Sequence, residues 1–421
     1  MFRLFTGRSV VVAHSLGVRE VVGSSPTAPN FFVVLEGAMV NFRRRILFCY
    51  ISPSSGHQRA AEAVMSVLRR RFPSVACEAV NSVSYVNPLF GKIVSRLYLQ
   101  ILKAVPSVWD YLYDNPWIEK NTRDVREVLS LFNTKRIVKV LRTHKPRCLV
   151  CTQAVPVGLL AALKEKEKLR IPLIGILTDF GVHKYWLSPH VDLYLVPTVE
   201  VRRSMVRMGV DESRVRVTGI PVDPHFSSPG DSRMERLSLG LSPTRPTVLV
   251  MGGSYGMGPL AEAMVSLRRM PLSPQLIVVC GNNRRLYKDM TQRFFEDRSV
   301  RVFGPTRTIH RLMTAADVLV SKPGGLTMSE ALVRGLPVVI VEPIPGQEER
   351  NAHFLLRQGT CVRAHRLTDL TREVEMLLTH PDLLKQLKEK AQAIARPLAA
   401  QDAADAIVDF IEKGGSRETG F

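Results

Sequence analysis

The chain has 421 residues, 45% of them hydrophobic, and a formal net charge of +20 at pH 7. This length excludes a single ordinary domain and favours two or three globular units with ample cores. No stretch reaches the ~18–20 uninterrupted apolar residues of a membrane-spanning helix. The longest apolar runs, such as residues 155–163, end in charged residues and are typical of core elements.

The positive charge is unevenly distributed along the chain. Residues 39–229 hold 29 Lys and Arg against 15 Asp and Glu, whereas residues 230–421 hold 26 against 21. A strongly basic half favours an anionic partner, either lipid headgroups or nucleic acid. A solvated basic surface is the alternative.

Six cysteines occur without metal-site spacing. Cys148 and Cys151 have CxxC spacing, but they lie in the apolar run 148–157, which has the pattern of a buried strand. We therefore predict core cysteines, no metal site and a reduced, cytosolic compartment.

Residues 1–38 differ in character from the rest of the chain. A signal peptide is disfavoured because the apolar segment 10–13 is short and His14 ends it. Residues 23–27, Gly-Ser-Ser-Pro-Thr, can be encoded by codons that contain the GTTCGA core of a tRNA T arm. We therefore expect a spurious or disordered extension over residues 1–38, with the true start at Met39.

From residue 43 the predicted elements alternate between apolar strands and amphipathic helices. The first helix is expected over residues 58–71, where apolar side chains recur at helical spacing. Residues 85–117 differ from their surroundings and combine aromatic, proline and long aliphatic residues. Strands are predicted at residues 46–51, 75–80, 147–152, 173–178 and 193–196.

Residues 219–246 are rich in Gly, Pro and Ser and are predicted to link two domains. A second strand and helix series follows, and a last amphipathic helix covers about 402–412. We predict an α/β protein with two Rossmann-like domains facing a cleft, 39–229 and 230–421, the last helix packing back on the first domain. The strands of the second series are predicted at residues 247–251, 276–280, 300–303, 318–321 and 338–341.

Two glycine-rich loops follow predicted strands of the second domain. Gly252–Gly258 would let backbone N–H groups approach a diphosphate at a helix N-terminus, although a tight turn alone would use the same residues. The second loop, residues 321–330, places Thr327 and Glu330 near a helix start. Glu330 could accept hydrogen bonds from two ribose hydroxyls, or the two side chains could cap the helix.

A third loop and two strand ends complete the polar set. Gln347 and Glu348 follow the last predicted strand and could contact sugar hydroxyls or cap a helix. His57 follows the first strand, where it could act as general base or merely position its loop. Asp179, at another strand end, could orient His57 or be the base itself. Trp186 suits a lipid-facing rim.

The strings SSGHQRAAEA, LTDFGVHKYW, TGIPVDPHF, GGSYGMGP and SKPGGLTMSEALVRGLPVVIVEPIPGQEERN appear in this order along the chain. Together they resemble the monogalactosyldiacylglycerol synthase and processive diacylglycerol glucosyltransferase family, which is related to the peptidoglycan N-acetylglucosaminyltransferase. The resemblance covers about residues 44–415.

This resemblance implies a GT-B fold and an inverting transfer of galactose or glucose from a UDP-sugar to 1,2-diacylglycerol, with no cofactor or metal required. His57 and Asp179 would be catalytic. Tyr85, Trp109, His183 and Trp186 would lie at the acceptor or membrane side. The UDP-sugar would contact Gly56, Gly252, Gly253, Ser254, Gly256, Met257, Gly258, Phe303, Gly304, Lys322, Gly324, Gly325, Thr327, Glu330, Gln347, Glu348 and Asn351.

Two departures from the plant galactolipid synthases favour the bacterial branch and leave the sugar open. Tyr255 stands where those enzymes carry an acidic residue, and Lys322-Pro323-Gly324-Gly325 stands where they carry AGPG. The expected location is cytoplasmic and peripheral, on the inner face of the plasma membrane, with anionic lipids as partners.

Two alternatives remain at this stage. One is a UDP-sugar-dependent transferase with a different lipid-linked or soluble acceptor. The other is a regulatory or nucleic-acid-binding protein with a sugar-nucleotide domain, which the basic half permits. No RNA-binding motif supports it, so no nucleic-acid partner is expected.

Overall fold

The computed structural model describes residues 32–35, 38–41, 44–51, 55–81 and 134–413. The predicted extension 1–38 therefore lies almost wholly outside the described residues. Its described part contributes to a short antiparallel pair, β1 (Phe32–Leu35) with β2 (Ala38–Asn41). The aromatic region 85–117, including Tyr85 and Trp109, also lies outside the described residues.

The first main sheet lies in the N-terminal half of the chain. Within the described residues it has six parallel strands in the order β4-β3-β5-β6-β7-β8. Its central strands are short apolar runs buried on both faces, as parallel strands covered by helices require. The strands are β3 (Arg44–Tyr50), β4 (Val75–Asn81), β5 (Cys148–Cys151), β6 (Leu173–Ile176), β7 (Leu193–Val196) and β8 (Val215–Val217).

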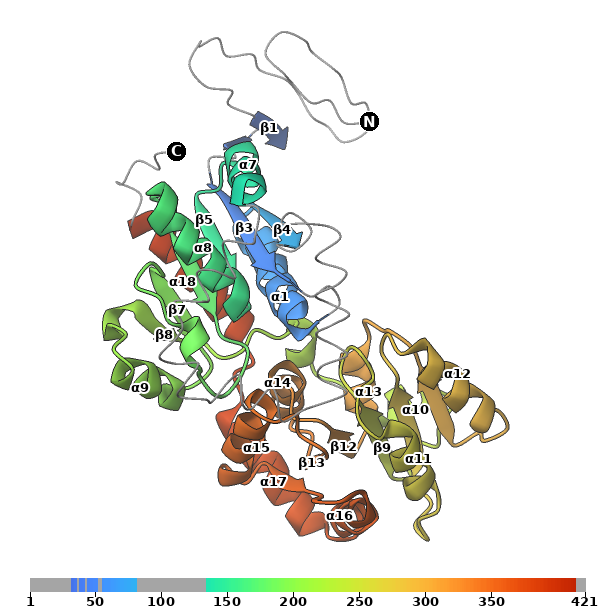
Figure 1. The fold of residues 1–421 in the computed structure, drawn as a ribbon. Helices are drawn as coiled ribbons and strands as arrows, with labels where there is room; N and C mark the ends of the chain where they lie inside the picture. The colour runs from blue at the N-terminus through green and yellow to red at the C-terminus, as the bar shows by residue number, and fades with distance from the viewer. Residues whose placement is uncertain (1–31, 36–37, 42–43, 52–54, 82–133, 414–421) are drawn as a thin grey trace.

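Helices cover both faces of this sheet and make a three-layer domain (Figure 1). One face packs against α1 and α18, and the other against α7, α8 and α9. The C-terminal helix α18 thus returns to the first domain, where its alanine and isoleucine side chains join the core beside α1. The helices are α1 (Gly56–Arg71), α7 (Thr134–His144), α8 (Ala154–Glu167), η1 (Lys184–Trp186), α9 (Val199–Arg207), η2 (Glu212–Arg214) and α18 (Ala399–Lys413).

The second sheet, in the C-terminal half, is also parallel throughout. Within the described part of the chain its six strands follow the order β11-β10-β9-β12-β13-β14. This is the Rossmann order, with the two halves of the sheet diverging between β9 and β12. The strands are β9 (Thr247–Met251), β10 (Gln275–Val279), β11 (Val300–Phe303), β12 (Val318–Ser321), β13 (Val338–Ile340) and β14 (Cys361–Arg363).

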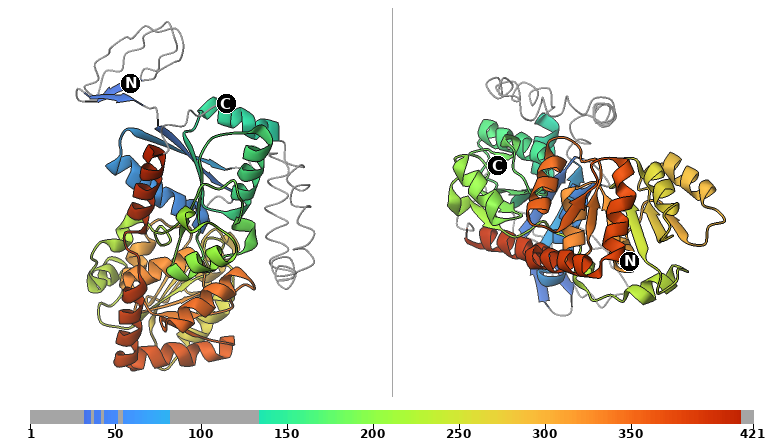
Figure 2. Two further views of the ribbon diagram at one scale, coloured as in Figure 1. Left: turned by 90° about the vertical axis from the view of Figure 1, so that its left-hand side faces the viewer. Right: turned by 90° about the horizontal axis from the view of Figure 1, so that it is seen from below.

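Two hydrophobic clusters flank the second sheet. One includes α13, α14 and α15, and the other α11, α12 and α16. Figure 2 shows the two domains one above the other, with the C-terminal helices running between them. The helices are η3 (Pro224–Ser227), α10 (Ser232–Ser238), α11 (Leu260–Arg268), α12 (Arg284–Arg293), α13 (Ile309–Ala315), α14 (Gly325–Arg334), α15 (Gln347–Arg357), α16 (Leu367–Thr379) and α17 (Pro381–Ile394).

The predicted α/β fold is confirmed, and the predicted strands agree with the observed ones to within two residues at each end. The edge strands β8 and β14 were not predicted, because each has three residues and is only partly buried. The segment 219–246 contains η3 and α10. Helix α10 is held to the second sheet by Arg236, which donates to the Ala315 carbonyl and pairs with Asp317.

Two further expectations concern the membrane and the cysteines. None of the helices in the described part of the chain is long and apolar enough to cross a bilayer. Cys148 and Cys151 lie at the two ends of β5 and contribute to the cores on opposite faces of the sheet, both buried and both free, as predicted for core residues. Burial raises the pKa of both thiols, so they are poor nucleophiles or metal ligands.

Candidate functional site between the two sheets

The predicted site residues follow strands that flank the switch points of the two sheets. In the first sheet the chain departs in opposite directions from β3 and β5. His57 is the second residue of α1, the helix that follows β3, and Thr152 comes directly after β5. In the second sheet the glycine-rich loops follow β9 and β12, on either side of its switch point. Ligands of doubly wound α/β domains bind in the crevice at these positions.

The loop Gly252–Gly258 has a shape that only glycine supports. Gly253, Gly256 and Gly258 have positive φ angles of 68°, 55° and 97°. At Gly256 a Cβ would lie 2.2 Å from the Cys280 carbonyl oxygen, so the loop is pressed against the turn after β10. Within the loop the N–H groups of Gly256 and Met257 donate to the Gly253 and Gly252 carbonyls, so contacts to a diphosphate would come from other N–H groups of this turn.

The second loop leads into α14 with Gly324 as its N-cap, and no side chain caps the helix. Thr327 is the third helical residue and Glu330 the sixth, so Glu330 lies beyond the first turn. The capping interpretation of Glu330 is therefore wrong, and its carboxylate is available for another role.

Burial raises the pKa of Glu330 to about 8, and the nearby Arg59 guanidinium of α1 opposes that shift. Arg59 also donates to the Thr306 carbonyl across the two domains, at 2.9 Å. An ionised carboxylate in such a place calls for hydrogen-bond donors, which the hydroxyls of a ribose would supply. Sequence reasoning did not identify Arg59, because an arginine one turn into a helix is common.

The third loop connects to both domains. Lys322 pairs with Glu348 at 2.8 Å in a largely buried contact, and the other Glu348 oxygen accepts from the Ile344 N–H. Gln347 Nε2 lies 3.0 Å from His183 Nε2, which belongs to the first domain. Burial, with Arg350 and His57 nearby, lowers the pKa of His183 to about 4, so its imidazole is neutral.

His57 is held in one tautomer by the strand ends around it. Its Nδ1 lies 2.8 Å from the Thr152 carbonyl oxygen, and the Thr152 hydroxyl donates to the His57 carbonyl. Because a carbonyl oxygen only accepts, Nδ1 carries the proton and Nε2 keeps its lone pair. The Thr178 hydroxyl lies 2.8 Å from the same Nδ1.

The electrostatic surroundings keep His57 neutral. Burial lowers the pKa of its imidazole, and the smaller opposing effects come from the Asp179 charge and the Thr152 carbonyl. A neutral imidazole with a free Nε2 is the form that a general base needs. The hydroxyl residues at the ends of β5 and β6, Thr152 and Thr178, are functional positions that the prediction did not include.

The remaining residues predicted to contact the UDP-sugar lie in different parts of the two domains. Gly56 is the first residue of α1, and a Cβ there would lie 3.3 Å from Leu326, so the starts of α1 and α14 meet. Asn351 makes hydrogen bonds to Asp179 and to the Phe180 N–H, so its amide is already engaged. Phe303 is the last residue of β11, and Gly304 follows it beside Tyr287.

Trp186 corrects one expectation. Its side chain is 2% exposed and packs in the core of the first domain, while its carbonyl accepts from the Tyr194 hydroxyl. A lipid-facing role for this tryptophan is therefore wrong. Its indole fills the space between η1, α8 and the sheet, and local sequence did not reveal this.

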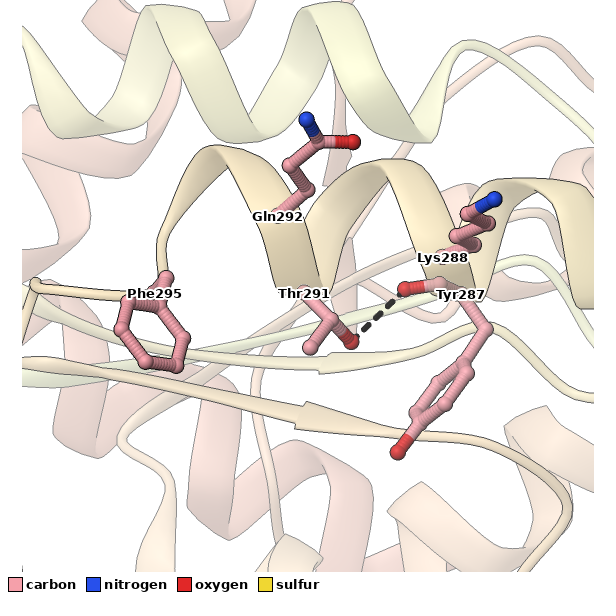
Figure 3. A pocket seen from close by; sticks show the side chains of 5 residues that line it. All are labelled: Tyr287, Lys288, Thr291, Gln292 and Phe295. Carbon is pink, nitrogen blue, oxygen red and sulfur yellow. Dashed lines mark hydrogen bonds between the residues drawn. The ribbon is translucent and has the colours of Figure 1, made fainter.

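The described residues offer little else that would compete as a site. They contain no group of three or more His, Cys, Asp or Glu that could hold a metal ion. A hollow of about 430 Å³ lies along α12, and Figure 3 shows the side chains that line it, none of them a predicted site residue. They are Tyr287, Lys288, Thr291, Gln292 and Phe295.

Comparison with known families supports this geometry. Residues 57–222 match the family described as monogalactosyldiacylglycerol (MGDG) synthase, and residues 252–394 match glycosyl transferases group 1. The chain is a glycosyltransferase of the GT-B fold. The resemblance predicted from the motifs is confirmed.

Two curated relatives of this glycosyltransferase carry the name processive diacylglycerol beta-glucosyltransferase. The one from Staphylococcus carnosus (strain TM300) is 28% identical over 81% of this chain and 85% of its own length. The one from Bacillus pumilus (strain SAFR-032) is 26% identical over 88% of this chain and 96% of its own.

Solved structures show the same fold at low sequence identity. Acinetobacter baumannii MurG has a TM-score of 0.54 at 16% identity and covers 87% of this chain and 99% of its own. Anabaena HepE in complex with UDP-glucose has a TM-score of 0.52 at 16% identity, covering 88% and 99%. Staphylococcus aureus MnaA, solved with UDP, has a TM-score of 0.58 at 12% identity, covering 90% and 100%.

Proposed function

We propose that this glycosyltransferase moves glucose or galactose from a UDP-sugar to 1,2-diacylglycerol, with inversion at the anomeric carbon. The observation that carries the proposal is the meeting of α1 and α14, where Gly56 lies against Leu326. This contact supports the proposal because His57, the general-base candidate, follows Gly56 directly, and Leu326 follows the second glycine-rich loop. The curated relatives, named for a diacylglycerol acceptor, support the choice of substrate.

The donor would lie against the second domain. Backbone N–H groups of the turn before α11, other than those of Gly256 and Met257, and of the start of α14 would face the diphosphate, where the helix dipole favours negative charge. The carboxylate of Glu330 would accept from the ribose hydroxyls, and Gln347 and Glu348 lie where they could contact the hexose.

The chemical step then needs a base on the acceptor side. The lone pair of His57 Nε2 takes the proton of the acceptor hydroxyl while that oxygen attacks the anomeric carbon. The bond from that carbon to the UDP oxygen breaks, and UDP leaves with the electron pair. The backbone N–H groups of the glycine loops stabilise the charge that develops on it. Asp179 either orients His57 or serves as the base itself.

The deciding experiment offers the purified protein UDP-glucose or UDP-galactose with diacylglycerol in liposomes, and identifies product lipids by mass. A hexosyl-diacylglycerol from one donor is expected, and a dihexosyl product would show processivity. The anomeric configuration of the product, read by NMR, tests inversion. Transfer only to a polyprenyl-linked or soluble acceptor would contradict the diacylglycerol assignment while preserving the donor site.

We further propose that the enzyme works as a peripheral protein on an anionic membrane at the cytoplasmic face. The net charge of residues 39–229 supports this, because acidic headgroups attract clustered Lys and Arg. At the end of α1, Arg69, Arg70 and Arg71 are exposed on the surface of this basic domain. The aromatic segment 85–117, which lies outside the described residues, remains the predicted apolar contact.

A further inference from the structure

The loop 178–181 belongs to the first sheet by chain order, yet its Phe180 packs in the core of the second domain. Phe180 is 9% exposed and lies in one cluster with Leu249, Met328 and Leu355. Its ring stacks on Phe354 of α15, with centroids 4.8 Å apart and planes 8° from parallel. The second domain therefore holds this loop in place by packing around the Phe180 ring.

Asn351, one turn earlier on α15, holds the backbone and the carboxylate of the same loop. Its side chain is 0% exposed. Its Oδ1 accepts from the Phe180 N–H at 2.7 Å, and its Nδ2 donates to Asp179 Oδ1 at 2.8 Å and to the Pro323 carbonyl at 3.0 Å. All its hydrogen-bonding groups are engaged, two of them with the first domain.

Two glycines allow the domains to approach this closely. A Cβ on Gly325 would lie 2.0 Å from the Thr178 carbonyl oxygen, and one on Gly181 would lie 3.0 Å from the Arg350 side chain. Any side chain at Gly325 would force the start of α14 away from the loop. Gly325 is therefore required for the contact between the two domains.

The same loop also contacts His57, the general-base candidate, because Thr178 Oγ1 lies 2.8 Å from His57 Nδ1. We propose that Asn351 and Phe354 are positioning residues that lock the loop 178–181, so that Asp179 and His57 reach their working geometry only when the donor domain is closed on the acceptor domain. The inference rests on the proposed function, since it assigns Asp179 and His57 to catalysis. Closure by the donor domain would then assemble the catalytic groups of the other domain.

The first test uses Asn351→Asp, which keeps the acceptor for Phe180 but places a carboxylate against Asp179. We expect kcat to fall roughly 10–100-fold, as for a small misplacement of catalytic groups, while the Kd for UDP changes little. Two facing carboxylates raise the pKa of the pair, so the acidic limb of the pH–rate profile moves upward. A rise in donor KM at unchanged kcat would instead make Asn351 a sugar-binding residue and overturn the proposal.

The reversed pair, Asp179→Asn with Asn351→Asp, separates the role of the 179–351 contact in holding the loop from the role of Asp179 in catalysis. It restores one amide-to-carboxylate hydrogen bond in the opposite sense. Because the carboxylate at position 351 still cannot donate to the Pro323 carbonyl, thermal midpoint and the closed shape in small-angle X-ray scattering should recover only part of what Asn351→Asp alone loses. The kcat should stay at the level of Asp179→Asn alone. These two physical readouts need no acceptor, so they test the lock even if the wild type fails to make a hexosyl lipid. Absence of rescue in both readouts would overturn the lock.

A second pair of variants tests the stacking contact between Phe180 and Phe354. Phe354→Ala, and Phe354→Leu in case the first folds poorly, should lower kcat and open the molecule in scattering. The matched control is Phe294→Ala, which removes an aromatic ring that packs on the opposite face of the same domain. The control should lower only the thermal midpoint. Equal behaviour of Phe354→Leu and Phe294→Ala, with unchanged kcat, would overturn the proposal.

Discussion

The two domains bring different chemistry to the cleft. The second domain offers backbone, in the form of a glycine loop with positive φ angles before α11 and a glycine N-cap, Gly324, at the start of α14. The first domain offers side chains, with His57 fixed by Thr152 and Thr178. Backbone donors suit a diphosphate that is the same in every donor, whereas side chains suit proton transfer. Under the proposed function, this difference corresponds to a donor held by one domain and proton transfer carried out by the other.

The largest effect should follow from removing the base in the first domain. His57→Ala is expected to lower kcat by roughly 10²–10⁴ because proton transfer in the transition state is lost. UDP binding, measured by calorimetry, should persist because the donor loops lie in the other domain. If His57→Ala stays active while Asp179→Asn is inactive, the two residues exchange roles.

Removing the ribose contact in the second domain should affect donor binding instead. Glu330→Ala is expected to raise the UDP-sugar KM at least about tenfold, since hydrogen bonds to a charged group contribute about 1.5–3 kcal/mol each. The acceptor KM should change little. The control is Glu262→Ala, an exposed acidic residue in the first turn of α11. An unchanged donor KM for Glu330→Ala would remove this residue from the donor site.

The ionisation of Glu330 should also make UDP binding depend on pH. With a pKa near 8, it is mostly protonated at pH 7, and ribose hydroxyls favour its ionised form. UDP binding should release protons and tighten as pH rises toward about 8. Calorimetry in buffers of different ionisation enthalpy measures this, and Glu330→Gln should abolish it.

The raised pKa of Glu330 also predicts that the free energy of unfolding changes with pH. Because the folded pKa lies above the unfolded value of 4.5, the folded state holds the proton more tightly. Wild-type stability should therefore fall as pH rises from about 4.5 through about 8, and Glu330→Gln should lose that part of the slope. Denaturant unfolding across this pH range is the measurement. Parallel curves for the two proteins would contradict the raised pKa.

A smaller shift is expected in the acidic limb of the pH–rate profile. The pKa of His57 lies below its ordinary value of 6.5, so kcat/KM should persist below that pH and fall only at lower pH. Asp179 opposes the lowering, so Asp179→Asn should move the limb further toward acid in whatever activity remains. A limb that moves upward would show that Asp179 is not the charge His57 senses.

The smallest expected effect concerns the membrane. Well-placed Lys and Arg residues contribute about 1 kcal/mol each at an acidic surface. Sedimentation with phosphatidylglycerol vesicles, weakening as salt rises and weak with neutral vesicles, is therefore expected. Trp109→Ala with Lys103→Glu, both outside the described residues, should weaken it without changing UDP affinity. Equal binding to neutral vesicles, or unfolding of the double variant, would place the contact elsewhere.

The sequence by itself determined the parts of this protein that depend on neighbours along the chain. Apolar runs identified the buried parallel strands, and glycines after β9 and β12 marked the two turns that lead into α11 and α14. His57 and Asp179 were found because polar residues at the ends of parallel strands gather at one edge of a sheet. Short edge strands such as β8 were missed because three half-buried residues carry little periodic signal.

The tertiary structure alone decided which of these residues meet. Nothing in the local pattern places Phe180 in the core of the other domain, buries Trp186 or commits the amide of Asn351 to Asp179. The outcomes for Phe180 and Asn351 depend on packing between segments more than 100 residues apart, as the separation of 172 between Asn351 and Asp179 shows. The burial of Trp186 depends on α8 and on neighbouring strands of the same sheet. A buried side chain packs against, and forms hydrogen bonds with, whichever partners the fold brings near it. The residue at one sequence position therefore does not specify its distant partner.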